Sequence, residues 1–487
     1  MAPSGRSGRV DKSSRPRHRF VAATVAACAM LSGEAAGQQA TWSQQDVTAD
    51  TGSGFADPYA APTGQEGDAL QATGLEPATA IAADEGTDFG QQDYGRENLP
   101  QGPVDGQASR GASTDPTGIR VGTMILRPSL TQGLLYEKNR AGNQSDSTLY
   151  SSTQLKGTLT SDWSRHELTV TSQGTWENVL SGNGDEGSNA DIGAELRLDL
   201  SDLTVARLSA AYGFSREDPD NDEAIEDATT QYGIHRFDAG ASIERDFGLL
   251  RGTVGVNGSR WIHTDATLAN GDSLSQSFRD RNLGEVSLRI GYELSPALIP
   301  FVEASVGRLQ YDQEKDPQGY ERSSNIYTGK IGISADFREK LRGEIGIGYT
   351  TEKFDDDRLD DLNGIVFAGN VTWSPRYGTD VKLDLSTGLD PSSVAGTSGS
   401  VVYETRLTVT QQVRENLVAS LSGATAWTKY PDLDNADSTE YSANAELSYE
   451  INRYLALVAG LGYEYTARDG GIDDDTLRAT VGITAKR

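Results

Sequence analysis

The sequence predicts an all-β protein. The expected fold is a transmembrane antiparallel up-and-down β-barrel of about 18 strands, or about 16 if one hairpin is misread, with a disordered N-terminal arm. Three observations predict it. Apolar and polar residues alternate in segment after segment beyond Thr117. Short turns and long loops follow one another regularly between those segments. The composition supplies too few apolar residues for a large buried core.

The composition suits a barrel with a wet interior. Hydrophobic residues make up 36% of the chain and the mean hydropathy is -0.51, yet the chain has 54 Gly, 19 Tyr and 6 Trp. A barrel needs only a thin apolar band on its outside, so this polar composition is sufficient for one. No run of about 18 apolar residues occurs, which excludes helical membrane spans.

The charge balance excludes one class of partner and favours another. The chain has 71 acidic and 43 basic residues, a formal charge of -28. Nucleic-acid binding depends on Lys and Arg contacts to phosphate, so we expect no nucleic-acid partner. A strongly acidic surface favours cations and cationic ligands.

The N-terminus has the pattern of a secretory signal. Three arginines between positions 15 and 19 precede the apolar stretch 20–31, and the small residues Ala35-Ala36-Gly37 follow. Positive, apolar and then small residues predict a signal peptide over 1–37, which exports the chain through the inner membrane. An alternative is that Val25-Ala26-Ala27-Cys28 acts as a lipoprotein cleavage box, so that Cys28, the single cysteine, is lipidated.

Residues 38–116 are rich in Ala, Gly, Gln, Asp and Pro and keep neither helical nor strand periodicity. Such a segment cannot bury enough apolar area to offset its ordering entropy, so we expect a disordered, low-complexity periplasmic arm. It is interpreted as a spacer, with a plug or a contact to peptidoglycan as the alternative. The barrel is then expected over residues 117–487, with its first strand beginning near Ile119.

The alternation is clearest in residues 190–200, 284–294 and 475–486, where every second residue is apolar and those between are mostly polar or charged. Transmembrane strands show this dyad, apolar outward and polar inward, over about ten residues each. The apolar positions are Ile192, Ala194, Leu196, Leu198, Leu200, Val286, Leu288, Ile290, Tyr292, Leu294, Leu477, Ala479, Val481, Ile483 and Ala485.

The connections alternate between short turns and long loops. Eight short turns and nine long loops give the strand number and place both termini on the periplasmic side, where such barrels have their short turns. The turns are expected at 161–162, 201–202, 246–248, 295–296, 338–340, 374–375, 414–416 and 452–453. The loops are expected near 138–147, 180–189, 216–231, 264–282, 312–323, 354–363, 389–400, 431–438 and 467–474.

Aromatic residues gather toward the ends of the expected strands, where they would form the two interfacial girdles. The alternative for any one of them is the ordinary β-propensity of aromatic side chains. The set is Tyr136, Trp163, Trp176, Tyr212, Phe214, Trp261, Tyr292, Tyr349, Trp373, Trp427, Tyr449, Tyr463 and Tyr465.

The opening segment carries a family resemblance. Residues 117–130 read TGIRVGTMILRPSL and continue to Tyr136-Glu137-Lys138-Asn139. This resembles the start of the putative β-barrel porin family of alphaproteobacterial outer membranes, whose members have a signal, a low-complexity arm and a "G-R-x-G-x-x-x-x-P" opening strand. The resemblance covers about 117–487 and implies an outer-membrane location and a porin role, with no catalytic residues. One departure is the end, Ala485-Lys486-Arg487, where many such barrels end in an aromatic residue.

Catalysis is not expected. Ser259 and His263 are near one another in sequence, but four residues along a strand span about 13 Å, too far for proton transfer. No cofactor is expected either. Acidic loop clusters are interpreted as solvated, repelling surface, with weak binding of divalent cations as the alternative; the residues are Asp218, Asp220, Asp222, Asp355, Asp356 and Asp357.

The polar face of the strands is expected to line the lumen. Its charged residues have both signs, an arrangement that can line a water-filled pore with a transverse field or pair up and close it. No inward-folding constriction loop is apparent. The expected pore-lining residues are Glu195, Arg197, Arg236, Glu285, Arg289, Arg342, Glu344, Glu404, Arg406 and Arg478.

The sequence therefore predicts an outer-membrane channel for passive diffusion of small hydrophilic solutes, with a preference for cations. The alternative is a non-conducting structural or surface-interaction barrel of the cell envelope. The expected partners are outer-membrane lipid, lipopolysaccharide, the barrel assembly machinery and the solutes. The sequence makes no prediction of the oligomeric state.

Overall fold

A computed structural model describes residues 117–487 apart from 183, 185–186, 218–224, 226–227, 338–339, 393–396 and 434–435. The predictions for the signal peptide, Cys28, the arm and Asp218, Asp220 and Asp222 lie outside the described residues. No helix in the described part of the chain is long and apolar enough to cross a membrane.

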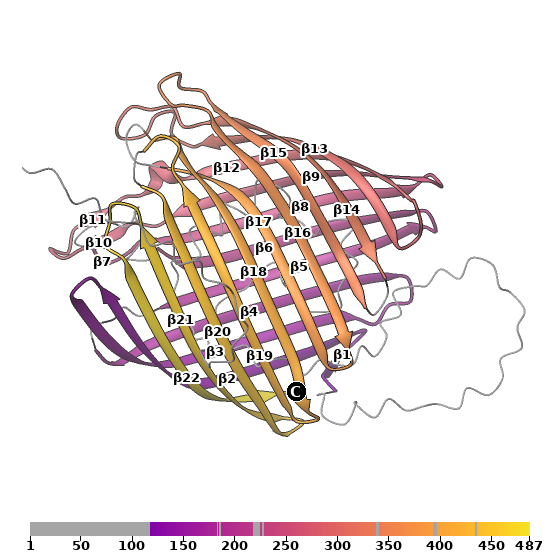
Figure 1. The fold of residues 1–487 in the computed structure, drawn as a ribbon, viewed down its shortest axis with the longest axis horizontal. Coiled ribbons are helices and arrows are strands. Elements are labelled where there is room, and N and C mark those ends of the chain that lie inside the picture. Colours follow the sequence, from indigo (N-terminus) through magenta and orange to yellow (C-terminus); the bar gives the residue numbers. More distant parts are fainter. Residues whose placement is uncertain are drawn as a thin grey trace, which may run out of the picture. The chain divides into compact units, whose positions relative to one another are not determined.

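The described chain forms a closed antiparallel barrel of 18 strands (Figure 1). Each strand pairs with the next wall strand in sequence, and β22 pairs with β2 to close the wall. The fold class predicted from the sequence is confirmed. The wall strands are β2 (Met124–Ala141), β3 (Gln144–Ser161), β4 (His166–Ser181), β5 (Ser188–Ser201), β6 (Thr204–Arg216), β8 (Gly233–Asp246), β9 (Leu250–His263), β12 (Arg281–Tyr292), β13 (Leu298–Tyr311), β14 (Ser324–Asp336), β15 (Leu341–Phe354), β16 (Leu362–Arg376), β17 (Thr379–Pro391), β18 (Gly399–Arg414), β19 (Leu417–Lys429), β20 (Ser438–Asn452), β21 (Leu455–Arg468) and β22 (Asp474–Lys486).

The strand faces are inverted relative to a water-soluble sheet. In β15, Ile345, Ile347 and Tyr349 are 48%, 48% and 55% exposed, whereas Glu344 and Glu352 on the other face are buried. Apolar side chains face outward because the solvent there is lipid, and polar ones face inward. The period-2 pattern therefore determines which residues can line the lumen.

The sorting of connections agrees with the sequence. All eight short turns are present, although the one expected at 374–375 lies at 377–378, between β16 and β17. Gly378 has a φ of 75° there, a backbone conformation that glycine adopts without strain. The opposite end of the barrel carries the longer loops, and we call that end the mouth.

Two expectations at the start of the barrel are wrong. The long loop near 138–147 is a two-residue turn, Gly142-Asn143, because β2 and β3 are each 18 residues long and stay paired with one another up to Ala141 and Gln144. The first wall strand begins at Met124, not near Ile119. The short strand β1 (Ile119–Val121) instead folds back through Gly122 and pairs with the beginning of β2.

The wall is interrupted at one place toward the mouth. The β16–β17 ladder runs from the short turn only as far as the pair Gly369–Leu385. Beyond it, the Phe367 amide donates to the Thr387 side chain rather than to a backbone carbonyl, at 3.0 Å. Because the ladder hydrogen bonds end at this position, β16 and β17 are no longer paired toward the mouth.

Because of this interruption, the mouth end of the β17–β18 hairpin lies inside β16. Leu362 lies on the inner face of β16, opposite the exposed Ile365, and packs against Leu389 of β17 and Val401 of β18. Leu389 and Val401 belong to the outward faces of their own strands. These contacts place the end of the hairpin on the inner side of β16, and an apolar cluster fills the overlap.

Candidate functional site

The barrel lumen is the candidate site, and β12 shows how it is built. Val286 and Leu288 are 47% and 50% exposed on the outside, while Glu285 and Arg289 are 6% and 2% exposed on the inside. Because side chains alternate across a strand, each wall strand supplies a row of polar groups to the lumen.

The most connected lumenal group is a four-residue charge network across β12 to β15. Arg289 Nη2 donates to Glu344 Oε2 at 2.6 Å, and its Nη1 lies 3.6 Å from Glu303 Oε2. Lys330 Nζ lies 2.8 Å from Glu303 Oε1. Two cations and two carboxylates thus share one patch of the wall, so their charges cancel locally.

Phe301 holds the Arg289 guanidinium against the wall. The guanidinium carbon lies 3.5 Å from the centre of the Phe301 ring, a cation–π contact. The ring lies so close to Gly332 of β14 that a Cβ there would be 2.4 Å from Phe301 Cζ. A glycine on the neighbouring strand therefore leaves the space that the ring occupies beside the guanidinium.

A second network covers β6, β8 and β9. Arg236 lies 3.0 Å from Asp238, and Arg207 lies 3.4 Å from Glu244. Ser259 donates to Asp238 at 2.6 Å. His263 instead contacts Asp280, at 3.2 Å, so Ser259 and His263 serve different partners.

The ten sequence-predicted residues all lie on the inward faces of their strands. Five of them form ion pairs or are buried, namely Arg236, Glu285, Arg289, Glu344 and Arg478. The other five are half-buried, namely Glu195, Arg197, Arg342, Glu404 and Arg406. The structure brings Arg289 and Glu344 into direct contact, although their separation in sequence gave no sign of it.

One sector of the lumen is acidic. On the inward faces from β18 through β22 to β4, buried and half-buried carboxylates outnumber the cations, so this part of the wall carries a negative potential. The carboxylates are Glu137, Glu167, Glu177, Glu404, Glu440, Glu446, Glu450, Glu464 and Asp474, and the cations are Lys156, Arg406, Arg468, Arg478 and Lys486.

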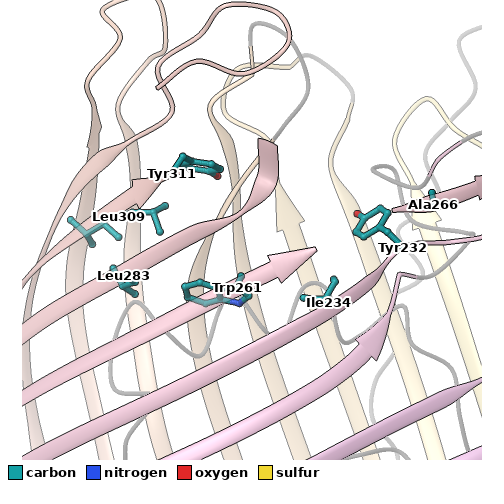
Figure 2. Close-up of a cluster of buried hydrophobic side chains, with 8 residues drawn as sticks. Tyr232, Ile234, Trp261, Ala266, Leu283, Leu309 and Tyr311 are labelled. Carbon is teal, nitrogen blue, oxygen red and sulfur yellow. The ribbon is translucent and has the colours of Figure 1, made fainter. Parts of the chain in front are cut away.

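The mouth holds an apolar cluster on the inner wall (Figure 2). This differs from the sequence prediction, in which the whole inner face was polar. Trp261 is 2% exposed within it, so its assignment to an outer aromatic girdle is wrong. The cluster also contains Tyr232, Ile234, Ala266, Leu283, Leu309, Tyr311 and Ile326.

Two long loops pack onto this cluster. They supply β7 (Ala228–Thr230), β10 (Ala266–Leu268) and β11 (Ser273–Leu274), which form a small separate sheet, and a 3-10 turn, η1 (Ser277–Arg279). Arg279 donates to the Tyr232 hydroxyl at 2.8 Å, and that hydroxyl donates to Glu217 at 2.7 Å. Two loops therefore fold onto the inner wall, although no such loop was apparent in the sequence.

A buried arginine joins two other loops at the mouth. Arg322, 3% exposed, lies 2.6 Å from Asp316 and donates to the carbonyls of Ser392 and Thr397, the latter at 2.9 Å. Ser398 N donates to Asp432 at 2.9 Å. The end of the β17–β18 hairpin is thus held by side chains from both sides.

The acidic loop 355–357 is partly neutralised. Asp355 pairs with Arg308 at 2.5 Å, and Asp356 pairs with Arg358 at 2.6 Å. The arginine beside each carboxyl lowers its pKa below the ordinary value. Among the residues that the structure describes, no three His, Cys, Asp or Glu side chains are grouped so as to hold a metal ion.

Sequence reasoning missed the apolar cluster and Arg322. A signal for the cluster existed, because Trp261, Leu283, Leu309 and Ile326 fall on the polar phase of their alternating strands. Arg322 gave none, since its partners come from loops that are far apart in the chain.

The comparison with known protein families agrees with this architecture. A model of the family described as Putative beta-barrel porin 2 matches residues 112–487. No curated protein matches the chain.

Three solved structures illustrate what the chain is similar to. Acinetobacter baumannii OccAB4 is 12% identical, with a TM-score of 0.37, 78% of this chain and 100% of that one covered. The Pseudomonas aeruginosa outer membrane protein opdK and OccK8 (OprE) are each 12% identical with TM-scores of 0.37. The alignment covers 74% of this chain in both cases, and 99% and 98% of theirs.

The inverted strand faces and the closed wall define a porin-like β-barrel of the outer membrane. The chain belongs to the Putative beta-barrel porin 2 family, as the match over residues 112–487 shows. The family resemblance of the opening strand is thereby confirmed.

Proposed function

We propose that the protein is a passive outer-membrane channel for small hydrophilic solutes, with a preference for cations. The observation that carries the proposal is the largely polar inner face of the barrel, to which most wall strands contribute charged side chains. Barrels of about 16–18 strands are wide enough for an aqueous channel. The mechanism needs no cofactor and no catalytic residue.

The cation preference rests on the acidic sector. Arg289, Glu303, Lys330 and Glu344 neutralise one another on β12–β15, so that side contributes little net field. The excess of carboxylates from β18 to β4 is not neutralised to the same degree. A low-dielectric wall focuses this field into the lumen and raises the local concentration of cations.

The second candidate is a non-conducting structural barrel, and the mouth favours it. The inward-packed loops, the apolar cluster around Trp261 and the Arg322 contacts all place protein inside the wall. In that case the loops would contact lipopolysaccharide or other envelope polymers. Weak binding of divalent cations by Asp357 and its neighbours would support such contacts.

The expected assembly follows from the sequence. A signal peptide over 1–37 would direct export, the arm 38–116 would remain in the periplasm, and the barrel assembly machinery would insert 117–487. The outward apolar faces would then contact outer-membrane lipid and lipopolysaccharide.

Recording from purified protein in planar bilayers separates the two candidates. Stepwise, steady conductance in KCl supports the channel. A protein that inserts, shown by its heat-modifiable migration in gels, but gives no conductance supports the structural barrel and overturns the proposal.

A further inference from the structure

Four polar side chains form a patch on the inner wall, which we call the β3–β4 patch. Ser152 and Gln154 of β3 lie directly opposite Glu177 and Thr175 of β4 in the ladder. All four are 1–2% exposed. Residues paired in this way have their Cβ atoms about 4.5–5.5 Å apart, so the four polar groups converge on one point.

Within the described part of the chain, the polar atoms of the patch have no hydrogen-bond partner outside the patch, and within it only the Ser152 hydroxyl lies close to the Glu177 carboxyl. These atoms are Ser152 Oγ, Thr175 Oγ1, both carboxylate oxygens of Glu177 and both amide atoms of Gln154. Asn189, which pairs with Thr175 across the next ladder, also has an unpartnered Oδ1. Burying one such atom without a partner costs free energy, and such a concentration of them calls for a ligand that supplies donors.

The nearby cation is already engaged. Arg478 Nε donates to Glu137 Oε2 at 2.9 Å, and its Nη1 lies 3.5 Å from Glu464. Asn139 donates to the other Glu137 oxygen at 3.3 Å. One arginine thus serves two carboxylates, and Glu177 forms no ion pair among the described residues.

We propose that the β3–β4 patch binds the primary ammonium group of a small cationic solute. An ammonium carries three N–H donors and no acceptor, which matches a carboxylate, an amide oxygen and two hydroxyls. Gly133 lies opposite Ser152 on β2 and adds no side chain of its own to the patch. The side chains of the chain's own arm offer no such group, because residues 38–116 contain no lysine.

This inference deepens the proposed channel and rests on it for its biological role. Binding can nevertheless be measured without transport. The probe is propylammonium, and the matched control ion is tetramethylammonium, which carries the same charge but has no N–H donor. Calorimetric titration of the full barrel in detergent gives the dissociation constant, and bilayer recording in KCl gives the effect on current.

Propylammonium should bind the natural protein and reduce its potassium current, and tetramethylammonium should do neither. Glu177→Gln removes the charge at nearly constant volume, and it should weaken propylammonium binding at least tenfold. Gln154→Leu should weaken it by a smaller factor. Glu450→Gln is the matched control, since Glu450 is an equally buried lumenal carboxylate that already contacts Lys486, and it should keep the propylammonium affinity.

The outcomes distinguish the two proposals. Conductance in KCl with no propylammonium binding, or with binding that Glu177→Gln leaves intact, overturns the ammonium site and leaves the channel standing. Equal effects of tetramethylammonium also overturn it, because they would show an unspecific acidic field. Binding that depends on Glu177 in a barrel that never conducts supports the site and contradicts the channel.

Discussion

Arg289 donates a 2.6 Å hydrogen bond to Glu344 across two intervening strands of the wall. Both side chains are nearly inaccessible to water, at 2% and 9% side-chain exposure. Arg289 therefore ties β12 to β15 on the lumenal side, while their outer faces contact lipid. Removing one partner of a buried pair leaves an uncompensated charge, which is what makes such a contact sensitive to substitution.

Arg289→Met should destabilise the barrel by about 3–5 kcal/mol, because Glu303 and Glu344 lose their shared cation in a site with little water. The free energy of unfolding in urea, followed by tryptophan fluorescence in micelles, measures the change. Arg120→Met is the control. Arg120 pairs with Asp162, but their side chains are 63% and 53% exposed, so little change is expected. Equal effects of the two substitutions would contradict the network.

Gly332→Ala should destabilise the barrel by about 1–3 kcal/mol, since the new Cβ would lie 2.4 Å from Phe301 Cζ and force the ring off Arg289. The same unfolding experiment measures it. Gly329, three residues away on β14, has nothing within 4 Å of an added Cβ and provides a matched control. If Gly329→Ala proves as harmful as Gly332→Ala, the close contact with Phe301 is not the cause.

The wall interruption predicts a specific cross-link. An added Cβ on Gly364 would lie 2.8 Å from Val401 Cγ1, two strands away, so Gly364→Cys with Val401→Cys should form a disulfide under mild oxidation. Had the β16–β17 ladder continued in register, Gly364 would instead face Asp390. Cross-linking of Gly364→Cys with Asp390→Cys, and not with Val401→Cys, would show an uninterrupted wall.

The contacts of Arg322 predict that this side chain keeps the loop between β17 and β18 ordered. Arg322→Gln should release residues 392 and 397–398 and raise their backbone hydrogen exchange severalfold, because the side chain contacts two of their carbonyls. Lys315→Gln is a control on the same loop, since Lys315 meets Glu321 in an exposed pair. Unchanged exchange at Thr397 in Arg322→Gln would rule out the proposed tether.

The pH dependence of the mouth follows from two exposed pairs. Arg260 lowers the pKa of Asp312, and Arg308 lowers the pKa of Asp355, mainly through hydrogen bonds. A carboxyl whose folded pKa is depressed adds stability above its unfolded pKa of about 3.9, and that stability is lost as pH falls through the folded pKa. Hydrogen exchange in loops 312–323 and 355–361 should thus rise below about pH 4. In Asp312→Asn and Asp355→Asn this step should disappear; a step that persists would show another cause.

The sequence predicted the features that depend on local pattern. The period-2 alternation in β5, β12 and β22 and the sorting of turns from loops were sufficient for the strand number, because a barrel wall repeats one local rule. The turn at Gly142 was misread, since the strand ends that flank it are polar on both faces and therefore look like a loop.

The site was predicted in outline and not in its contacts. Because side chains alternate along a strand, the sequence tells which of them face inward. Arg289 and Glu344 could be assigned to the lumenal face in this way. The Arg289–Glu344 contact depends on strand stagger and on the space left by Gly332, which no local pattern encodes. The apolar cluster at Trp261 depends on two loops that fold back over it. The absence of Trp261 from the outer aromatic girdle depends on the same loops.

The most direct test of the account is the reversal potential of single channels in a KCl gradient. An open lumen with an acidic sector predicts steady conductance and a reversal potential of the sign set by potassium. Conversion of Glu404, Glu440 and Glu464 to Gln should move it toward zero. A reversal potential of the sign set by chloride, or a correctly inserted barrel that passes no current, would contradict the account.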